Sequence, residues 1–292
     1  MGSNERAPEH SLSEKDFRFI CKLVYDGTGI VLNERKQDMV YRRLMRRTRD
    51  LKLASFNEYC RLLQDDNNDE FPNFVNAITT NLTSFFREEH HFDYLCEKFI
   101  PQHLSQYKHT HKLRIWSAAC STGEEPYSLA MTLIKTAPAL IKSWDMKILA
   151  TDLDTDVLST ARSGVYKSER IKDLSKVDRN KWFVNGSGAN NGKVKVSDEL
   201  KSLITFKQLN LLDEWPMRGP FDVILCRNVL IYFDRPTQAK LIQRYHQMLR
   251  PGGVLMLGHS ESLPKDNTQF ATLGRTIFAK HSTSTEQPYA QG

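Results

Sequence analysis

Three acidic residues in the middle of the chain are placed where they could bind a ligand. Glu124 and Glu125 follow a run of seven small residues (117–123), and Asp152 follows the apolar run 146–151. Ligands of open parallel sheets bind beyond the carboxyl ends of the strands, where small residues allow close approach to the backbone. The two glutamates would repel a phosphate at this helix start and attract a cation. The alternative is a tight turn with solvated acids.

The same region argues for a nucleoside ligand without phosphates. An acid at the end of the second strand, here Asp152, typically accepts hydrogen bonds from ribose hydroxyls, whereas Asp154 is expected to cap the next helix. The chain has neither the dinucleotide fingerprint G-x-G-x-x-G nor the phosphate loop G-x-x-x-x-G-K-[ST]. S-adenosylmethionine, which carries a sulfonium and a free amino group, fits this combination. A helix that stops at Pro251-Gly252-Gly253 before a late apolar run is common in methyltransferases of this fold.

Strand and helix patterns alternate in the second part of the chain. Short apolar runs occupy 113–117, 146–151, 221–226 and 254–258. Helical periodicity occupies 125–135, 154–162 and 236–249. This alternation predicts an α/β fold with a doubly wound, Rossmann-like sheet.

The remaining segments predict the domain organisation. We expect a small N-terminal helical domain, a helix with a polar linker, the α/β domain and a flexible tail, at residues 11–84, 85–112, 113–280 and 281–292. Within the α/β domain, residues 181–207 contain short β-prone runs around a glycine-containing loop. They predict a small antiparallel β insertion.

Positive charge is concentrated in one stretch of the helical part. The chain of 292 residues has a formal net charge of +6. Residues 35–52 hold eight basic and two acidic side chains, so the rest of the chain sums to zero. Arg42, Arg46 and Arg49 fall opposite the apolar stripe of the predicted helix. This pattern indicates a docking surface rather than a general affinity for polyanions.

Several classes of protein are excluded by what the sequence lacks. No run approaches the roughly 18 apolar residues of a membrane span, and the N-terminus has no signal-peptide pattern. The five cysteines form no Cys-x-x-Cys pair, which predicts reduced thiols in the cytoplasm. The histidines lack carboxylate partners at ligand spacing, so no metal site is expected. No Gly-x-Ser-x-Gly elbow indicates a hydrolase.

Five segments together resemble the signature segments of the CheR chemotaxis methyltransferases. They are 80–88 (TNLTSFFRE), 117–127 (SAACSTGEEPY), 152–154 (DLD), 210–212 (NLL) and 226–234 (CRNVLIYFD). The resemblance extends over about residues 11–280 and implies a class I methyltransferase domain. It implies transfer of a methyl group from S-adenosylmethionine to glutamate side chains of bacterial chemoreceptors during sensory adaptation. The products would be γ-glutamyl methyl esters and S-adenosylhomocysteine.

The resemblance also implies roles for individual residues. The cofactor site would comprise Asn81, Thr83, Arg87, Glu124, Asp152, Asn210, Leu211, Arg227 and Asn228. In it, Glu124 would hold the methionine amino group and Asp152 the ribose, while Asn210 and Leu211 would flank the adenine. The two residues implied to be catalytic, because they would steer the acceptor carboxylate, are Arg87 and Tyr232. The alternative for Tyr232 is a buried core aromatic.

Partners follow from the same resemblance. The basic helix, through Arg42, Arg46 and Arg49, would dock on the methylation helices of the receptors. The β insertion would grip a short peptide at a receptor's C-terminus with the loop that contains Gly186, Gly188 and Gly192. We expect a cytoplasmic monomer that is recruited to membrane-bound receptor arrays, without nucleic acid and without membrane insertion. Two alternatives remain: an RNA methyltransferase whose basic domain tracks phosphates, and a non-catalytic scaffold that binds a nucleoside or a receptor tail.

Overall fold

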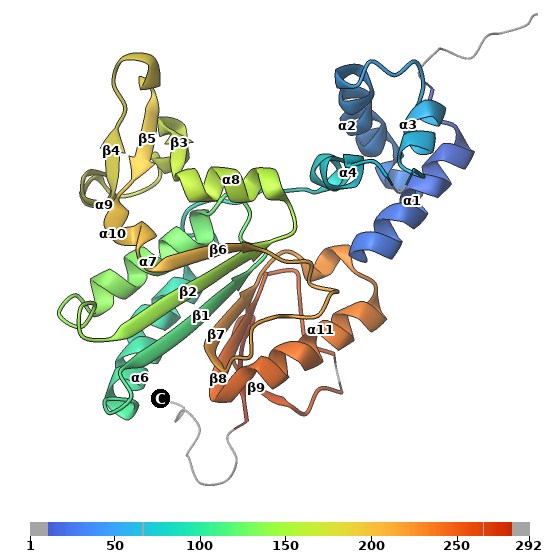
Figure 1. Ribbon diagram of the computed structural model, residues 1–292. Helices are drawn as coiled ribbons and strands as arrows, with labels where there is room; N and C mark the ends of the chain where they lie inside the picture. Colours follow the sequence, from blue (N-terminus) through green and yellow to red (C-terminus); the bar gives the residue numbers. More distant parts are fainter. Residues whose placement is uncertain (1–10, 66, 265, 282–292) are drawn as a thin grey trace, which may run out of the picture. The chain divides into compact units, whose positions relative to one another are not determined.

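The computed structural model describes residues 11–65, 67–264 and 266–281 (Figure 1). Contacts divide the chain into two compact units. The first comprises Met1–Thr80 and Tyr232–Asp234, and the second comprises Asn81–Ile231 and Arg235–Gly292. The division between them falls at 80/81, a few residues before the predicted boundary. Apart from residue 281, the predicted tail lies outside the described residues.

The first unit is built from amphipathic helices. They are α1 (Glu14–Thr28), the 3-10 turn η1 (Glu34–Lys36), α2 (Gln37–Asp50), α3 (Phe56–Leu62) and α4 (Glu70–Ile78). Ser13 caps α1 by accepting the Asp16 amide at 3.1 Å. The basic helix α2 starts at Gln37, after η1, and the side chain of Asn33 before η1 makes no capping bond.

The second unit contains a seven-stranded mixed sheet. Its strand order is β6-β2-β1-β7-β8-β10-β9. The first five strands in this order are parallel, and β10 is antiparallel to both of its neighbours. The strands are β1 (Lys112–Ala118), β2 (Asp145–Asp152), β6 (Ile204–Gln208), β7 (Phe221–Cys226), β8 (Leu249–Leu257), β9 (Phe270–Gly274) and β10 (Ile277–Lys280). The predicted α/β class with a Rossmann-like sheet is confirmed. The antiparallel pair β9 and β10 was not predicted.

Helices accompany this sheet. They are α5 (His90–Tyr94), the π-helical turn η2 (Leu95–Phe99), α6 (Ile100–Gln106), α7 (Glu124–Thr136), α8 (Thr155–Ser163) and α11 (Arg235–Met248). In Figure 1, α11 lies beside β8, and α8 lies beside β2 and β6. Helix α7 contacts β2 and also packs against α5 and α6. Because β1, β2 and β7 are parallel, the loops that leave them share one end of the sheet.

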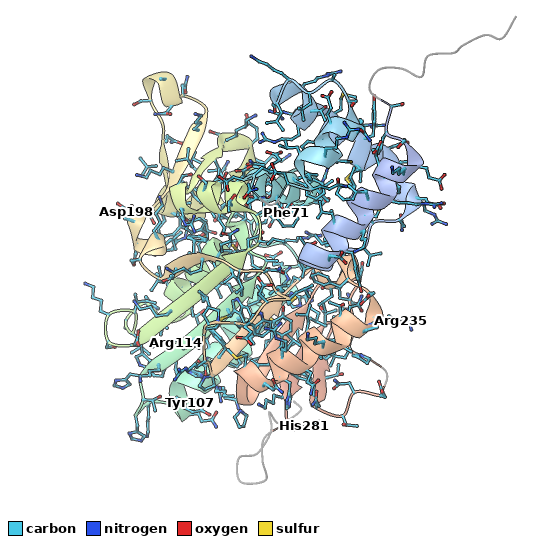
Figure 2. All side chains as sticks on the ribbon, turned by 45° about the vertical axis from the view of Figure 1, so that its right-hand side comes forward. Phe71, Tyr107, Arg114, Asp198, Arg235 and His281 are labelled. Carbon is cyan, nitrogen blue, oxygen red and sulfur yellow. The ribbon has the colours of Figure 1, made fainter. Side chains whose placement is uncertain are left out.

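The predicted polar linker before the sheet is wrong, because much of it forms α6. His103 in this helix is only 2% exposed. Its ring stacks between Phe99 and Tyr107, and its Nε2 atom lies 2.8 Å from the carbonyl oxygen of Lys112. Figure 2 shows Tyr107 and Arg114 at the same end of the sheet, where β1 begins. Hydrophobic periodicity missed α6 because one of its two buried side chains is the polar ring of His103.

The β insertion differs in extent from the prediction. A small antiparallel sheet of order β3-β5-β4 contains β3 (Val165–Lys167), β4 (Phe183–Asn185) and β5 (Lys193–Val196). The turns η3 (Ser168–Ile171) and η4 (Gly188–Asn190) and the helices α9 (Lys176–Trp182) and α10 (Asp198–Lys201) connect it. It therefore begins before residue 181. The end of the predicted insertion, residues 204–207, instead belongs to β6, which pairs with β2 in the main sheet.

The described residues form neither a membrane-spanning helix nor a metal-binding cluster. No helix among them is both long enough and apolar enough to span a membrane. In the same part of the chain, no cluster of three or more His, Cys, Asp or Glu side chains is arranged to hold a metal ion.

Candidate functional site

Asp152, at the end of β2, is a buried carboxylate held by backbone amides. Its Oδ2 atom accepts the Ser121 amide at 2.7 Å, and its Oδ1 atom accepts the Asp154 amide at 3.0 Å. The residue is 8% exposed. Burial raises the pKa of Asp152 to about 6, although these amide hydrogen bonds oppose the shift. The carboxylate is therefore poised to accept further hydrogen-bond donors.

The loop after β1 reaches this carboxylate through an unusual backbone path. Ala119 and Ser121 have φ angles of 69° and 51°, in the left-handed region that side chains disfavour. Gly123 has φ 98°, and a Cβ there would lie 2.9 Å from the Cβ of Ala161 in α8. Strained backbone of this kind clusters at functional sites. Glycine is required here for packing between the loop and α8.

Glu124 is completely buried at the start of α7. Its Oε2 atom accepts the Thr122 hydroxyl at 2.6 Å, and its Oε1 atom accepts Nε of Arg170 at 3.1 Å. The same arginine donates from Nη2 to the carbonyl oxygen of Thr83 at 2.8 Å. The alternative of a solvated acid is therefore wrong at this position. Glu124 is instead a buried anion beside a half-exposed cation.

Glu125 belongs to a second buried pair. It accepts the Ser117 hydroxyl at 2.7 Å and Nη1 of Arg227 at 3.0 Å. Burial raises the pKa of Glu125, although the charge and hydrogen bond of Arg227 and the bond from Ser117 act against the shift. Arg227 also donates to the carbonyl oxygen of Arg87. Arg227 thus connects the end of β7 with the start of α7 and with the segment before α5.

Glu88 is the third acid of this cluster. Its Oε1 atom accepts the Asn228 side-chain amide at 3.2 Å and the His259 backbone amide at 3.2 Å, and Nδ1 of His259 lies 2.9 Å away. Nη2 of Arg227 lies 3.3 Å from its Oε2 atom. Burial alone would raise the pKa of Glu88, but the His259 bonds, the Arg227 charge and the Asn228 bond lower it to about 2. Glu88 is therefore an anion whose Oε1 atom accepts hydrogen bonds, whereas its Oε2 atom forms the ion pair with Arg227 but accepts no hydrogen bond from the described residues.

The segment 81–88 brings three of the predicted site residues to the same end of the sheet. Asn81 donates from Nδ2 to Oδ2 of Asp154 at 2.7 Å. Thr83 is tied to Arg170 by its carbonyl oxygen. Arg87 donates from Nη1 to a carbonyl oxygen within the segment at 2.7 Å. The segment is thus fastened to the loop that follows β2 and to the turn η3.

Asn210 and Leu211 follow β6, the strand next to β2. The Leu209 amide donates to the carbonyl oxygen of Asp152 at 2.9 Å, which brings these residues beside the β2 end. The side chain of Asn210 accepts the Leu212 amide at 3.1 Å, and Leu211 is buried. The pair forms an ordered turn next to the carboxylate.

Tyr232 groups with the helical unit, unlike the predicted cofactor-site residues, which all belong to the second unit. Its carbonyl oxygen accepts the Val31 amide at 2.8 Å, and Nζ of Lys36 lies 5.4 Å from the centroid of its ring. The ring is half-buried.

The five arginines of α2 divide into two groups. Arg43 donates to the carbonyl oxygens of Ile78 and Thr79, each at 2.6 Å, and Arg47 forms a bidentate pair with Glu70 at 2.6 and 2.7 Å. The three arginines predicted to dock on a receptor are exposed; they are Arg42, Arg46 and Arg49. Arg43 and Arg47 therefore make contacts within the helical unit, whereas the other three arginines are exposed.

The loop between β4 and β5 lies at the tip of the insertion. Gly188 and Gly192 have φ angles of 57° and 76°, and a Cβ on Gly186 would lie 2.2 Å from the carbonyl oxygen of Asn190. Strand β4 is an edge of the small sheet, and its Val184 side chain is 65% exposed. The three glycines thus permit a tight turn beside a free strand edge.

The polar groups around Asp152 fit a nucleoside ligand with a cationic chain. A buried carboxylate at the β2 end suits two ribose hydroxyls, and the ordered turn after β6 is next to it. Buried acids at the start of α7 disfavour a phosphate there and suit an ammonium group. The residues present therefore fit S-adenosylmethionine.

Comparison with known proteins decides the family. The profile of the CheR methyltransferase SAM-binding domain matches residues 81–279, and that of the CheR methyltransferase all-alpha domain matches residues 15–79. The chain belongs to the CheR methyltransferase family. A chemotaxis protein methyltransferase of Salmonella typhimurium is 44% identical over 271 residues, which cover 92% of this chain and 91% of the relative. The Escherichia coli chemotaxis protein methyltransferase is also 44% identical, over 92% of each chain. Chemotaxis protein methyltransferase 2 of Pseudomonas aeruginosa is 44% identical over 93% of this chain and 95% of the relative.

Membership in the CheR family confirms the predicted cofactor. The second unit is an S-adenosylmethionine-binding domain, and the chain is an S-adenosylmethionine-dependent methyltransferase. Sequence reasoning gave no role to three side chains that organise this site, namely Glu88, Arg170 and His259. It predicted Glu125 as a cation-binding acid, and the structure pairs Glu125 with Arg227. No local signal could have identified Glu88, because its partners are 140 and 171 residues away along the chain.

Proposed function

We propose that this CheR methyltransferase transfers the methyl group of S-adenosylmethionine to glutamate side chains of bacterial chemoreceptors and forms γ-glutamyl methyl esters. The observation that carries the proposal is the buried Asp152 carboxylate, which backbone amides hold at the β2 end beside a loop whose acids disfavour phosphate. The enzyme would act in the cytoplasm on membrane-bound receptor arrays. S-adenosylmethionine, when bound, supplies a sulfonium methyl group to an anionic oxygen.

No general base is needed for this reaction. A glutamate side chain, with a reference pKa of about 4.3, is already ionised at neutral pH. The enzyme has to align that carboxylate with the methyl group and exclude water from it. We assign the cofactor contacts to Asp152 for the ribose, Glu124 for the amino group, and Asn210 with Leu211 for the adenine. The further contacts would come from Asn81, Thr83, Arg87, Arg227 and Asn228.

Arg87 and Tyr232 would orient the acceptor. Arg87 is half-buried, and one nitrogen of its guanidinium donates to a carbonyl oxygen, which fixes the direction of the group. A guanidinium offers further donors in a plane, which suits a carboxylate. We expect Arg87→Ala to abolish productive acceptor binding, and a radiolabel assay that finds methyl transfer near the normal rate would refute this role.

The exposed arginines of α2 would meet acidic surface on the receptor helices. The double variant Arg42→Glu, Arg46→Glu should lower kcat/KM for receptor methylation by about tenfold at low salt and flatten its salt dependence. Affinity for S-adenosylhomocysteine should not change. Lys15→Glu, on the exposed face of α1, is the matched charge reversal. Loss of cofactor affinity in the double variant would contradict a docking role.

The insertion would bind a short peptide at the receptor's C-terminus. A peptide can add to the free edge of β4, while the loop that contains Gly186, Gly188 and Gly192 closes over it. A receptor that lacks its C-terminal segment should then be methylated more slowly, with an increase in KM rather than a decrease in kcat. Equal KM values for the two receptors would remove this contact.

The central experiment uses labelled S-adenosylmethionine and receptor-rich membranes. Glutamyl esters release methanol in alkali, so the label should be base-labile and protein-bound. Base-stable label, or label on RNA added to the same assay, would overturn the proposal. Cofactor binding without any transfer would favour a scaffold.

A further inference from the structure

The carboxylate of Glu261 joins the ends of two neighbouring strands. Its Oε2 atom accepts the backbone amides of Gly258 at 2.6 Å and Asn228 at 2.9 Å. Its Oε1 atom accepts those of Val229 at 2.8 Å and Ile231 at 3.3 Å. Gly258 follows β8, whereas the other three follow β7, the parallel partner of β8. Glu261 is 7% exposed, so four amides converge on one buried anion.

The backbone at Asn228 depends on this arrangement. Asn228 has φ 59°, in the left-handed region. A Cβ on Gly258 would lie 2.6 Å from the backbone nitrogen of Asn228 and 2.8 Å from Oε2 of Glu261. Hydrogen bonds to an ionised acceptor are stronger than neutral ones, so the carboxylate can maintain a strained conformation. The three residues form a tightly packed group.

This group determines where two predicted cofactor-site side chains lie. Asn228 donates from its side chain to Glu88 at 3.2 Å. Arg227, one residue earlier, donates to Glu125 at 3.0 Å and to the carbonyl oxygen of Arg87. A change of backbone direction at Asn228 would move both side chains away from these partners. Accurate placement of such groups matters for binding and for rate.

We infer that Glu261 is a positioning residue for the cofactor site and for methyl transfer. It acts through the backbone of the loop 228–231, which it holds in the conformation that directs Asn228 and Arg227. The part that concerns methyl transfer rests on the proposed function, whereas the part that concerns cofactor binding does not.

The first test is Glu261→Gln in the full chain. Glutamine keeps the size of the side chain but turns one acceptor oxygen into an NH2 group that faces amide donors. We expect affinity for S-adenosylhomocysteine, measured by calorimetry, to fall about tenfold. At saturating cofactor, kcat for receptor methylation should fall about tenfold, with KM for receptor within twofold of normal. Glu199→Gln, on exposed α10, should change neither. Normal affinity in Glu261→Gln would overturn the inference.

A double-mutant cycle separates positioning from general support of the fold. If Glu261 acts through Asn228, Glu261→Gln should weaken S-adenosylhomocysteine binding tenfold in the normal background but less than threefold in an Asn228→Ala background. A tenfold loss in both backgrounds would mean that Glu261 is only structural, and would overturn the inference.

Two further measurements keep the test decisive if Glu261→Gln does not fold. Gly258→Ala leaves the carboxylate intact and displaces Asn228 by its Cβ, so it should weaken S-adenosylhomocysteine binding similarly. In the unmutated protein, the amides that bond to Glu261 should exchange slowly with deuterium, and fast exchange would overturn the inference. If the unmutated protein binds S-adenosylhomocysteine but does not methylate receptor membranes, the proposed function fails, while these binding results still test Glu261.

Discussion

The Asp152 region and the Glu88 region are two acidic centres at one end of the same sheet, and they are neutralised differently. Asp152 is held by backbone amides, and burial raises its pKa to about 6. Glu88 is surrounded by His259, Arg227 and Asn228, and its pKa falls to about 2 despite burial. A carboxylate whose ionised form is under-stabilised gains most from new donors. We therefore expect Asp152 to accept hydrogen bonds from the ligand directly, whereas Glu88 would act by holding Arg227 and Asn228 in place.

The strongest way to break this comparison is Asp152→Asn. We expect affinity for S-adenosylhomocysteine to fall by about 100-fold, because asparagine keeps only one of the two acceptor oxygens and a lost hydrogen bond to a charged acceptor costs roughly 1.5–3 kcal/mol. Calorimetry measures the change. Asp156→Asn, at an exposed position in the first turn of α8, is the matched control and should bind normally. A loss of less than threefold in Asp152→Asn would remove Asp152 from the cofactor site.

Glu88→Gln should affect folding more than binding. It leaves Arg227 with one acidic partner fewer, and we expect the free energy of unfolding to fall by about 2 kcal/mol in urea titrations. The lowered pKa of Glu88 means that its contribution is present above pH 4.5 and is lost as the pH falls toward 2. The difference in the free energy of unfolding between the variant and the normal protein should therefore disappear over that pH range. Glu89→Gln, exposed at the next position, should unfold normally; equal curves for the two variants would contradict the assignment.

Glu124→Gln separates the two ends of the ligand. We expect affinity for S-adenosylhomocysteine to fall about tenfold, or about 1.4 kcal/mol, because a neutral amide holds an ammonium group less well. Affinity for 5′-methylthioadenosine, which lacks the amino-acid group, should stay the same. If both ligands lose affinity equally, Glu124 acts through the shape of the loop instead.

The smallest predicted effect is the pH dependence of cofactor binding. The pKa of Asp152 is about 6, so below that pH the side chain is mostly protonated. It must lose this proton before it can accept hydrogen bonds from both ribose hydroxyls. Affinity should therefore rise about fourfold between pH 5.5 and 7 and then level off. Because this pKa is raised, folding stability changes with pH in the opposite direction to cofactor affinity. The contribution of Asp152 to the free energy of unfolding is full below pH 3.8 and is lost as the pH rises through about 6. A flat binding profile would mean that Asp152 is already ionised in the free protein.

Sequence patterns predicted the features that depend on local order along the chain. Strand and helix alternation predicted the parallel sheet, and the position of Asp152 after a strand-like run predicted its place at the sheet's end. The β9 and β10 pair and helix α6 were missed, because their inward residues do not form long apolar runs. The buried ring of His103 is the clearest case.

The surroundings of the acidic side chains could not be predicted from the same patterns. Glu124 begins α7 and Asp152 ends β2, so both are acids beside a loop, yet one lies beside Arg170 and the other is bonded to amides. The partners of Glu88 and Glu261 come from strand ends far along the chain, and their convergence depends on strand register. Burial and register are tertiary properties, and a single sequence without structure does not contain them in readable form.

The buried base and exposed tip of the small β insertion constrain how its sequence can change. Trp182 and Val194, at its base, belong to the same hydrophobic core as the main sheet, and Phe183 packs edge-on against Phe85. Its tip, in contrast, is exposed throughout 187–193. Substitutions at the tip can therefore accumulate without exposing aromatic surface, whereas loss of the whole module would uncover it. We expect sequence differences among CheR enzymes to be few at the base of the insertion and frequent in its exposed tip.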